Sequence, residues 1–158
     1  EFRRVLFRSY KKSIKEIFML LSTLSRKEKL KFLDLALHMV LVDGAPSTQE
    51  QRILNMMLAE VGENIIDEYE FVKSDALEDT IQFFDVLDET TQRIVYLNLI
   101  RITLFENVYN TAEHEFLETI RMRFHIKDDI KHELIQYVYQ EKDLRENIQK
   151  LITHPWKK

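Results

Sequence analysis

A helix–loop–helix pattern occurs twice in this sequence and limits what the chain can fold into. Positions 36–54 read ALHMVLVDGAPSTQEQRIL, and 63 positions later 99–117 read LIRITLFENVYNTAEHEFL. In each copy an apolar stretch ends at a short polar loop, and Ser47 or Asn110 then opens a new helix with a glutamate three residues further on. Residues of these types satisfy the free amides at a helix start. The pattern therefore predicts two helical hairpins of the same design.

Glycine and proline are too scarce for a sheet protein. The 158 residues include two of each, whereas a β-fold needs many tight turns. Hydrophobic residues make up 45% of the chain, which is enough for a core in one domain of this length. We therefore predict an all-α fold: a single compact domain of about seven helices that contains the repeated hairpin.

The first nine residues, EFRRVLFRS, differ in character from the rest of the chain. Written back into codons they can read GAG TTC AGA CGT GTG CTC TTC CGA TCT, which resembles a common short-read sequencing adapter translated in frame. We therefore expect residues 1–9 to be a non-native leader from assembled, metagenomic DNA, and residues 10–158 to form the domain. The net charge of residues 10–158 is more negative than the −4 of the whole chain, because the leader contains three arginines and one glutamate.

Local signals place the helices along the chain. Ser25-x-x-Glu28 and Ser47-x-x-Glu50 have the form of capping boxes, and glycines 44 and 62 follow helical stretches that glycine can end. Asp88 can cap a long apolar helix that we expect to be deeply buried. The expected helical stretches are 14–24, 26–41, 48–61, 65–72, 77–87, 89–105, 111–124, 127–140 and 143–153.

Several functional classes find no support in the sequence. A net charge of −4 with interleaved acids and bases argues against nucleic-acid binding. No apolar run reaches the roughly 18–20 residues that span a bilayer. The chain has no cysteine, which suits a cytoplasmic location. Its five histidines lack zinc-site spacing and are expected at the surface or its boundary, and no phosphate loop or nucleophile elbow occurs.

Two carboxylates stand where helix capping does not explain them. Asp43 and Glu106 end the first helix of each hairpin, where the negative end of the helix dipole disfavours an acid. The turn can bring each of them close to a glutamate of the second helix, Glu50 or Glu113. Loop amides or a basic side chain can stabilise such an acid, and so can a cation, since oxygen ligands suit calcium, magnesium or manganese. Asp43, Glu50, Glu106 and Glu113 are therefore candidate ligands of a divalent cation.

The first hairpin resembles the tellurite-resistance TerB family. The resemblance extends over about residues 30–140 and is carried by the helix ending in Asp43-Gly44, the polar loop and the Ser47-x-x-Glu50 helix start. The second copy departs from the family pattern, with Glu-Asn in place of Asp-Gly. The resemblance implies a compact all-α domain with a pseudo-two-fold repeat and acidic residues on one face, associated with metal binding. It also implies a role in tellurite, chemical-stress or phage resistance beside membrane-associated and other Ter-type partners.

The leading hypothesis for function is a non-enzymatic TerB-like stress or defence module that binds a protein partner. It leaves open whether a divalent cation binds at the acidic hairpin turns. The alternatives are a carboxylate-dependent metal hydrolase and a metal-free helical scaffold or regulator. No activating base or anion cradle accompanies the acids, which favours a binding module over the hydrolase. The partner and the oligomeric state are open at this point.

Overall fold

The computed structural model describes residues 19–42, 44–69, 77–105 and 110–154. Within these ranges the chain forms helices and no strands, which confirms the predicted all-α fold. The expected leader, residues 1–9, lies outside the described residues. A short 3-10 helix, η1 (Leu21–Thr23), precedes α2 (Arg26–Leu41), α3 (Thr48–Val61), α4 (Glu63–Glu68), α5 (Leu77–Asp85), α6 (Glu89–Phe105), α7 (Thr111–Arg123) and α8 (Asp128–Thr153).

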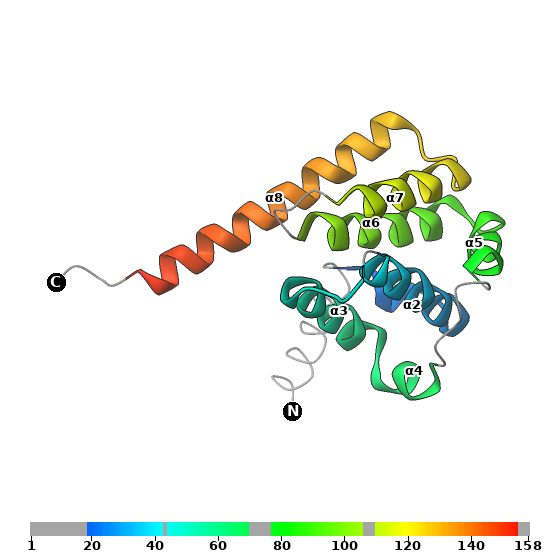
Figure 1. The fold of residues 1–158 in the computed structure, drawn as a ribbon, viewed down its shortest axis with the longest axis horizontal. Coiled ribbons are helices and arrows are strands. Elements are labelled where there is room, and N and C mark those ends of the chain that lie inside the picture. The colour runs from blue at the N-terminus through cyan, green and yellow to red at the C-terminus, as the bar shows by residue number, and fades with distance from the viewer. Residues whose placement is uncertain (1–18, 43, 70–76, 106–109, 155–158) are drawn as a thin grey trace, which may run out of the picture.

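Helix α6 forms the centre of the fold. It packs against α2, α3, α5, α7 and α8, and Figure 1 shows it between α7 and the α2–α3 hairpin. Its apolar side chains occur on nearly all sides of the helix, and Val95, Leu99 and Ile100 are fully buried. A helix that is apolar all round is stable only where neighbours cover each face. The burial predicted for this stretch is therefore confirmed.

Side-chain caps fix where the helices of the two predicted hairpins begin. Ser47 accepts a hydrogen bond from the Glu50 amide at 3.1 Å, and Asn110 accepts one from the Glu113 amide at 3.2 Å. Asp88 does the same for α6, with Oδ1 2.9 Å from the Thr91 amide. Each cap contributes about 1 kcal/mol by satisfying an otherwise free amide. These starts agree with the sequence predictions because capping depends on neighbours three residues away.

Glycine residues end α2 and α3 for a conformational reason. Gly44 has φ +125° and Gly62 has φ +105°. A Cβ at either position would meet no atom within 4 Å, so the backbone conformation rather than space requires glycine. The Gly62 amide donates to Leu58 O at 3.1 Å and closes the last turn of α3.

Three helical predictions were wrong in extent. α8 is one helix where the pattern predicts two, because 141–142 contains no glycine or proline and Lys142 donates to Leu104 O at 3.3 Å. Of the predicted helix 14–24, residues 14–18 lie outside the described part of the chain; Leu20 has φ +62°, and the 3-10 turn Leu21–Thr23 follows it. α4 begins earlier and ends at Glu68, since the extended Tyr69 directs its hydroxyl to α2.

The C-terminal half of α8 extends beyond the other described helices, as Figure 1 shows. Val138 is the one buried residue of this 26-residue helix, and Leu144, Leu151 and Ile152 are more than 60% exposed. None of the described helices combines the length and the apolar character that a membrane span requires.

Candidate functional site

The first predicted turn is built around Glu50, whose carboxylate completes a helix cap. Glu50 Oε2 accepts a hydrogen bond from the Ser47 amide at 2.7 Å, in return for the bond from the Glu50 amide to Ser47 Oγ. Glu50 is 4% exposed, whereas the equivalent box of α2, formed by Ser25 and Glu28, lies at the surface. Glu50 therefore has a structural role that requires no cation.

Replacing Glu50 with alanine should lower the free energy of unfolding by about 2 kcal/mol, because the half-buried Ser47 amide loses its acceptor at a position closed to water. Glu28→Ala is the matched control, since it breaks the same motif where water can replace the carboxylate, and it should cost about 0.5 kcal/mol. Urea unfolding followed by circular dichroism measures both. Equal losses in the two variants would contradict the assigned role of Glu50 as a buried cap.

The second predicted turn also contains a helix cap. Asn110 caps α7, and Glu113 is 6% exposed. Asp43 and Glu106 lie outside the described residues. Within the described ranges, no three His, Cys, Asp or Glu side chains form a group that could hold a metal ion. The cation site and the two-fold relation between the hairpins therefore stay predictions.

Thermal unfolding with added calcium, magnesium or manganese tests the cation hypothesis. A cation held by Asp43 and Glu50 should raise Tm with increasing concentration, because it binds the folded state alone. Asp43→Asn combined with Glu50→Gln should abolish the increase. A wild-type Tm that none of the three ions changes, or an increase that survives in the double variant, would contradict a site at this turn.

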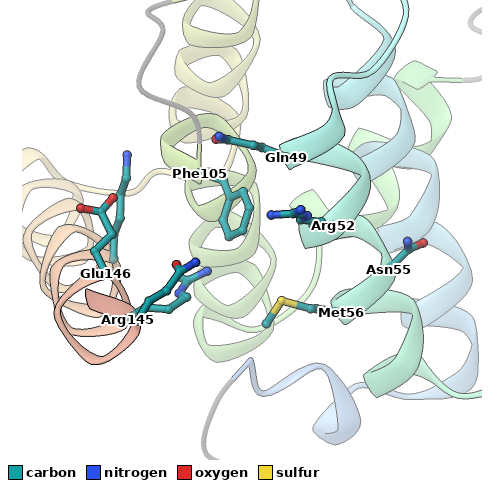
Figure 2. A pocket seen from close by; sticks show the side chains of 9 residues that line it. Gln49, Arg52, Asn55, Met56, Phe105, Arg145 and Glu146 are labelled. Carbon is teal, nitrogen blue, oxygen red and sulfur yellow. The ribbon is translucent and has the colours of Figure 1, made fainter. Parts of the chain in front are cut away.

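A groove between α3 and α8 is a stronger candidate for a binding site. It has a volume of about 460 Å³, and the C-terminal end of α6 lies at its base. Figure 2 shows Phe105 between the two walls, with Arg52 and Met56 on one wall and Arg145 on the other. The lining residues are Gln49, Arg52, Asn55, Met56, Phe105, Lys142, Arg145, Glu146 and Gln149.

The charges of this groove are mainly positive, although the whole chain is acidic. Three cationic side chains and one carboxylate line it, against a net charge of −4 for the chain. Arg145 lies over the Phe105 ring, with Cζ 4.9 Å from the ring centroid, and Lys142 donates to the carbonyl end of α6. The cation–π contact accounts for Arg145, and the negative carbonyl end of α6 accounts for Lys142. Neither contact accounts for Arg52, on the opposite wall.

The arginines of the groove, exposed Arg52 and half-buried Arg145, differ from the other arginines of the described residues in their pairing. Neither Arg52 nor Arg145 forms an ion pair with an acid of the described residues, whereas Arg101, Arg121 and Arg123 each do. A second hollow of about 420 Å³, beside the α7–α8 turn, is lined by acids and bases in similar number. The α3–α8 groove is therefore the better site for an anionic ligand.

A buried polar network crosses the centre of the fold. Asn98, with no exposed surface, donates through Nδ2 to Met19 O and Ile94 O, each at 2.8 Å. Its Oδ1 accepts from Arg101 Nη1 at 3.0 Å, and Arg101 binds Glu141 through Nε (3.0 Å) and Nη2 (2.7 Å). The network joins Met19, which precedes η1, to α6 and α8, and its groups satisfy one another.

Glu60 holds the chain before α2 against α3. Its Oε1 accepts from the Leu21 amide at 2.9 Å and from the Ser22 amide at 3.4 Å. Burial raises the pKa of Glu60, and the two backbone hydrogen bonds and the charge of Arg101 oppose this shift. The carboxylate therefore acts as a structural acceptor.

Asp34 is a second buried acid, on α2. It accepts from Tyr69 Oη at 2.8 Å and from Thr80 Oγ1 at 3.3 Å, so it ties α2 to the end of α4 and to α5. Burial raises the pKa of Asp34, while the two hydroxyl donors and Lys31 lower it. Buried acids with raised pKa values are candidate catalytic groups. Asp34 and Glu60, however, line neither hollow and have structural partners.

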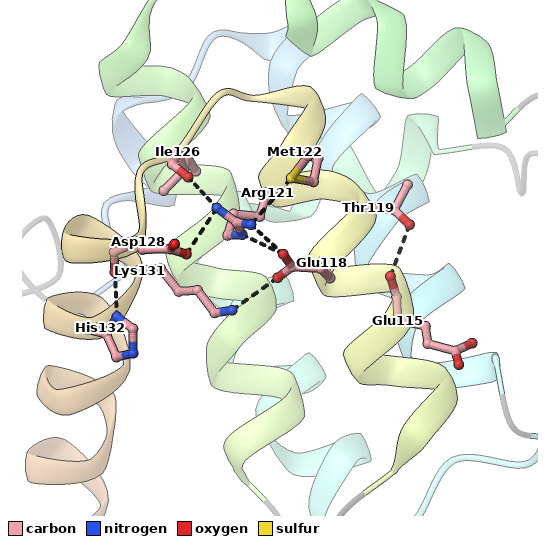
Figure 3. A network of polar contacts seen from close by, with 9 residues as sticks. All are labelled: Glu115, Glu118, Thr119, Arg121, Met122, Ile126, Asp128, Lys131 and His132. Atoms are coloured by element: carbon pink, nitrogen blue, oxygen red, sulfur yellow. Dashed lines mark hydrogen bonds and ion pairs between the residues drawn. The ribbon is translucent and has the colours of Figure 1, made fainter.

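A surface network fixes the corner between α7 and α8, as Figure 3 shows. Glu118 accepts from Arg121 and from Lys131 Nζ, the latter at 3.0 Å. Arg121 Nη1 also donates to Ile126 O at 2.9 Å and lies 3.3 Å from Asp128 Oδ1. Hydrogen bonds from Arg121 and then Lys131 lower the pKa of Glu118 from 4.5 to about 2.

The lowered pKa of Glu118 predicts an acid-sensitive contribution to stability. Its carboxylate is more acidic when folded, so the contribution is present above pH 4.5 and is lost as the pH falls toward 2. Because the Glu118 side chain is 43% exposed and water screens its ion pairs, we expect its contribution to the free energy of unfolding to be about 1 kcal/mol at pH 7. The stability difference between wild type and Glu118→Gln should shrink between pH 4.5 and 2. Glu115→Gln, which removes a carboxylate without such partners on the same helix, is the matched control; an equal response of the two variants would contradict the assignment.

Sequence reasoning missed the groove and the buried networks. The signal for the networks was available, because Asp34, Asn98 and Arg101 each interrupt a strongly apolar stretch. The residues that pair with them are distant in sequence, and nothing in the sequence around those residues indicates the pairing. The five histidines are half-buried or exposed, as predicted, and the His38 ring packs against Phe116 in a tilted arrangement with ring centroids 4.6 Å apart.

Comparisons of the chain with protein-family models, with curated proteins and with solved structures give no match. The resemblance to the TerB family therefore stays a prediction.

Proposed function

We propose that this chain is a non-enzymatic helical module that binds an acidic, amphipathic helical segment of a protein partner in the α3–α8 groove. One observation carries the proposal: Arg52 and Arg145 border an apolar base, and neither pairs with an acid of the described residues. Carboxylates on a partner can pair with these arginines in a bidentate manner.

The apolar part of the groove suits a helical ligand. Phe105 is half-buried and Met56 is 40% exposed, so both can take up apolar side chains. Methionine adapts its shape to different ligands. An amphipathic helix inserts apolar residues spaced by three or four positions into such a groove. Its flanking acids would face Arg52 on one wall and Arg145 on the other, so the partner should carry glutamates on both sides of its apolar stripe.

Fluorescence anisotropy with a designed probe tests the proposal. The probe is a labelled helical peptide with leucines at i, i+4 and i+7 and flanking glutamates, and its matched control has lysines in place of the glutamates. The acidic peptide should bind at least tenfold more tightly, and added salt should weaken its binding. Arg52→Glu with Arg145→Glu should reduce its affinity at least tenfold.

Lys150→Glu is the protein control. It reverses a charge on the same helix outside the groove lining, so the affinity for the acidic peptide should change less than twofold. Equal binding of the acidic and basic peptides, or equal losses in the groove and control variants, would contradict the proposal.

The likeness of the first hairpin to the TerB family extends the proposal to a stress or phage-defence role. It also suggests that the partner belongs to a Ter-type assembly. Gene neighbourhood tests this extension: Ter-like or defence genes beside the gene support it, whereas an operon of central metabolism contradicts it. Peptide binding and gene neighbourhood can fail independently.

A further inference from the structure

The projecting end of α8 carries an apolar stripe that no described helix covers. The stripe consists of Leu144 (62% exposed), Ile148 (49%), Leu151 (72%) and Ile152 (74%). Their spacing of i, i+4, i+7 and i+8 places them on one face of the helix. This face is turned away from the α3–α8 groove, whose α8 wall is formed by Lys142, Arg145, Glu146 and Gln149. The stripe therefore needs an explanation of its own.

We propose that the stripe pairs with the same stripe of a second copy of the chain, with the two α8 helices antiparallel about a two-fold axis at Ile148. Leu144 and Ile152 each lie about 6 Å from Ile148 along the helix, in opposite directions. An antiparallel pair therefore places Leu144 of one copy against Ile152 of the other and Ile148 against itself. The stripe is complementary to its own image, as an isologous interface requires.

The charges around the stripe favour a second copy over a lipid surface. Asp143, Arg145, Glu146 and Lys150 sum to zero over this part of the helix, whereas a helix that lies on anionic lipid has a cationic polar face. Helical geometry turns Glu146 and Lys150 to the side opposite the stripe. Asn147 flanks the stripe on one side and Arg145 and Gln149 flank it on the groove side, and the pairing sets Arg145 of one copy opposite Leu151 of the other. Antiparallel packing therefore brings no like charges together.

The overlap is short, so the dimer should be weak. Four side chains from each helix cover less than the roughly 800 Å² per partner of a standard stable interface. We expect a dissociation constant on the order of 100 μM, with the two globular bodies at opposite ends of the helix pair.

Disulfide trapping tests the pairing and its direction, since the chain has no cysteine of its own. Ile148→Cys should cross-link to itself. Leu144→Cys and Ile152→Cys, on copies of different size, should cross-link with each other and each fail to cross-link alone. Val86→Cys, at an 84% exposed site elsewhere, measures random collision. Self-linking of Leu144→Cys, which indicates parallel helices, or linking no faster than Val86→Cys would overturn the proposal.

Sedimentation equilibrium gives an independent measurement on the chain without cysteine. The weight-average mass of wild type should rise between about 10 μM and 1 mM. Leu144→Lys with Ile152→Lys should remain monomeric with unchanged helix content, and Val86→Lys should behave as wild type. A monomeric wild type at 1 mM, or one that floats with anionic vesicles instead of self-associating, would overturn the proposal. Neither result bears on peptide binding in the groove.

Discussion

Replacing Arg101 with methionine should lower the free energy of unfolding by about 3 kcal/mol. The guanidinium makes two hydrogen bonds to Glu141 and one to Asn98, and its side chain is 7% exposed. Methionine fills similar volume but leaves the Glu141 carboxylate and Asn98 Oδ1 without these donors. Removing the buried member of this ion pair costs more than the pair itself contributes, because Asn98 Oδ1 stays desolvated and Glu141, 31% exposed, is only partly hydrated.

Arg93→Met on the same helix is the control. Arg93 pairs with Glu89, but the two side chains are 47% and 80% exposed, so we expect a change of about 0.5 kcal/mol or less. Urea unfolding of both variants at pH 7 gives the comparison. Adding Glu141→Gln to Arg101→Met should recover part of the loss, since it removes the unpaired charge. Equal losses in the free energy of unfolding for Arg93→Met and Arg101→Met would contradict the idea that burial makes the Arg101 ion pair more important for stability.

The second large effect is expected at Asn98. Asn98→Ala removes the donor to Met19 O and the acceptor for Arg101, at a cost of about 2–3 kcal/mol, and leaves a small cavity beside the most buried part of α6. The loss should also have a local signature, because Met19 O is anchored by this amide. Amide hydrogen exchange at Leu21 should accelerate at least tenfold.

Asn64→Ala is the matched control for Asn98. Asn64 is exposed on α4, so neither global stability nor exchange at Leu21 should change. An Asn98→Ala variant that loses global stability without faster exchange at Leu21 would mean that Asn98 stabilises α6 alone and does not anchor the chain before α2.

Features that depend on neighbours in sequence could be predicted for this chain. Ser47, Asp88 and Asn110 cap their helices where expected, because the amide that each one satisfies lies three residues ahead. The burial of α6 followed from its all-round apolar pattern. In contrast, the continuity of α8 depends on what it packs against, and Lys142 contacts the carbonyl end of α6, 38 positions earlier.

The candidate site could not be predicted in the same way. The groove exists because Arg52 on α3 and Arg145 on α8 face each other across Phe105, and no local pattern links these positions. The buried ion pair likewise joins residues 40 positions apart. Sequence reasoning gave weight to Glu50 as a candidate cation ligand, and the structure shows that its carboxylate completes a cap. Asp43 and Glu106 lie outside the described residues, so their role stays a prediction, and within the described residues the groove arginines are the arginines without an acidic partner.

An NMR footprint of the acidic peptide on the ¹⁵N-labelled chain is the most direct test of the proposed function. Binding in the groove predicts amide shift changes centred on Arg52, Met56, Phe105 and Arg145, with the lysine-substituted peptide causing none at the same concentration. Changes centred on the exposed stripe of α8 or beside Arg93 and Lys127, or the same footprint from both peptides, would contradict recognition of an acidic helix by the α3–α8 groove.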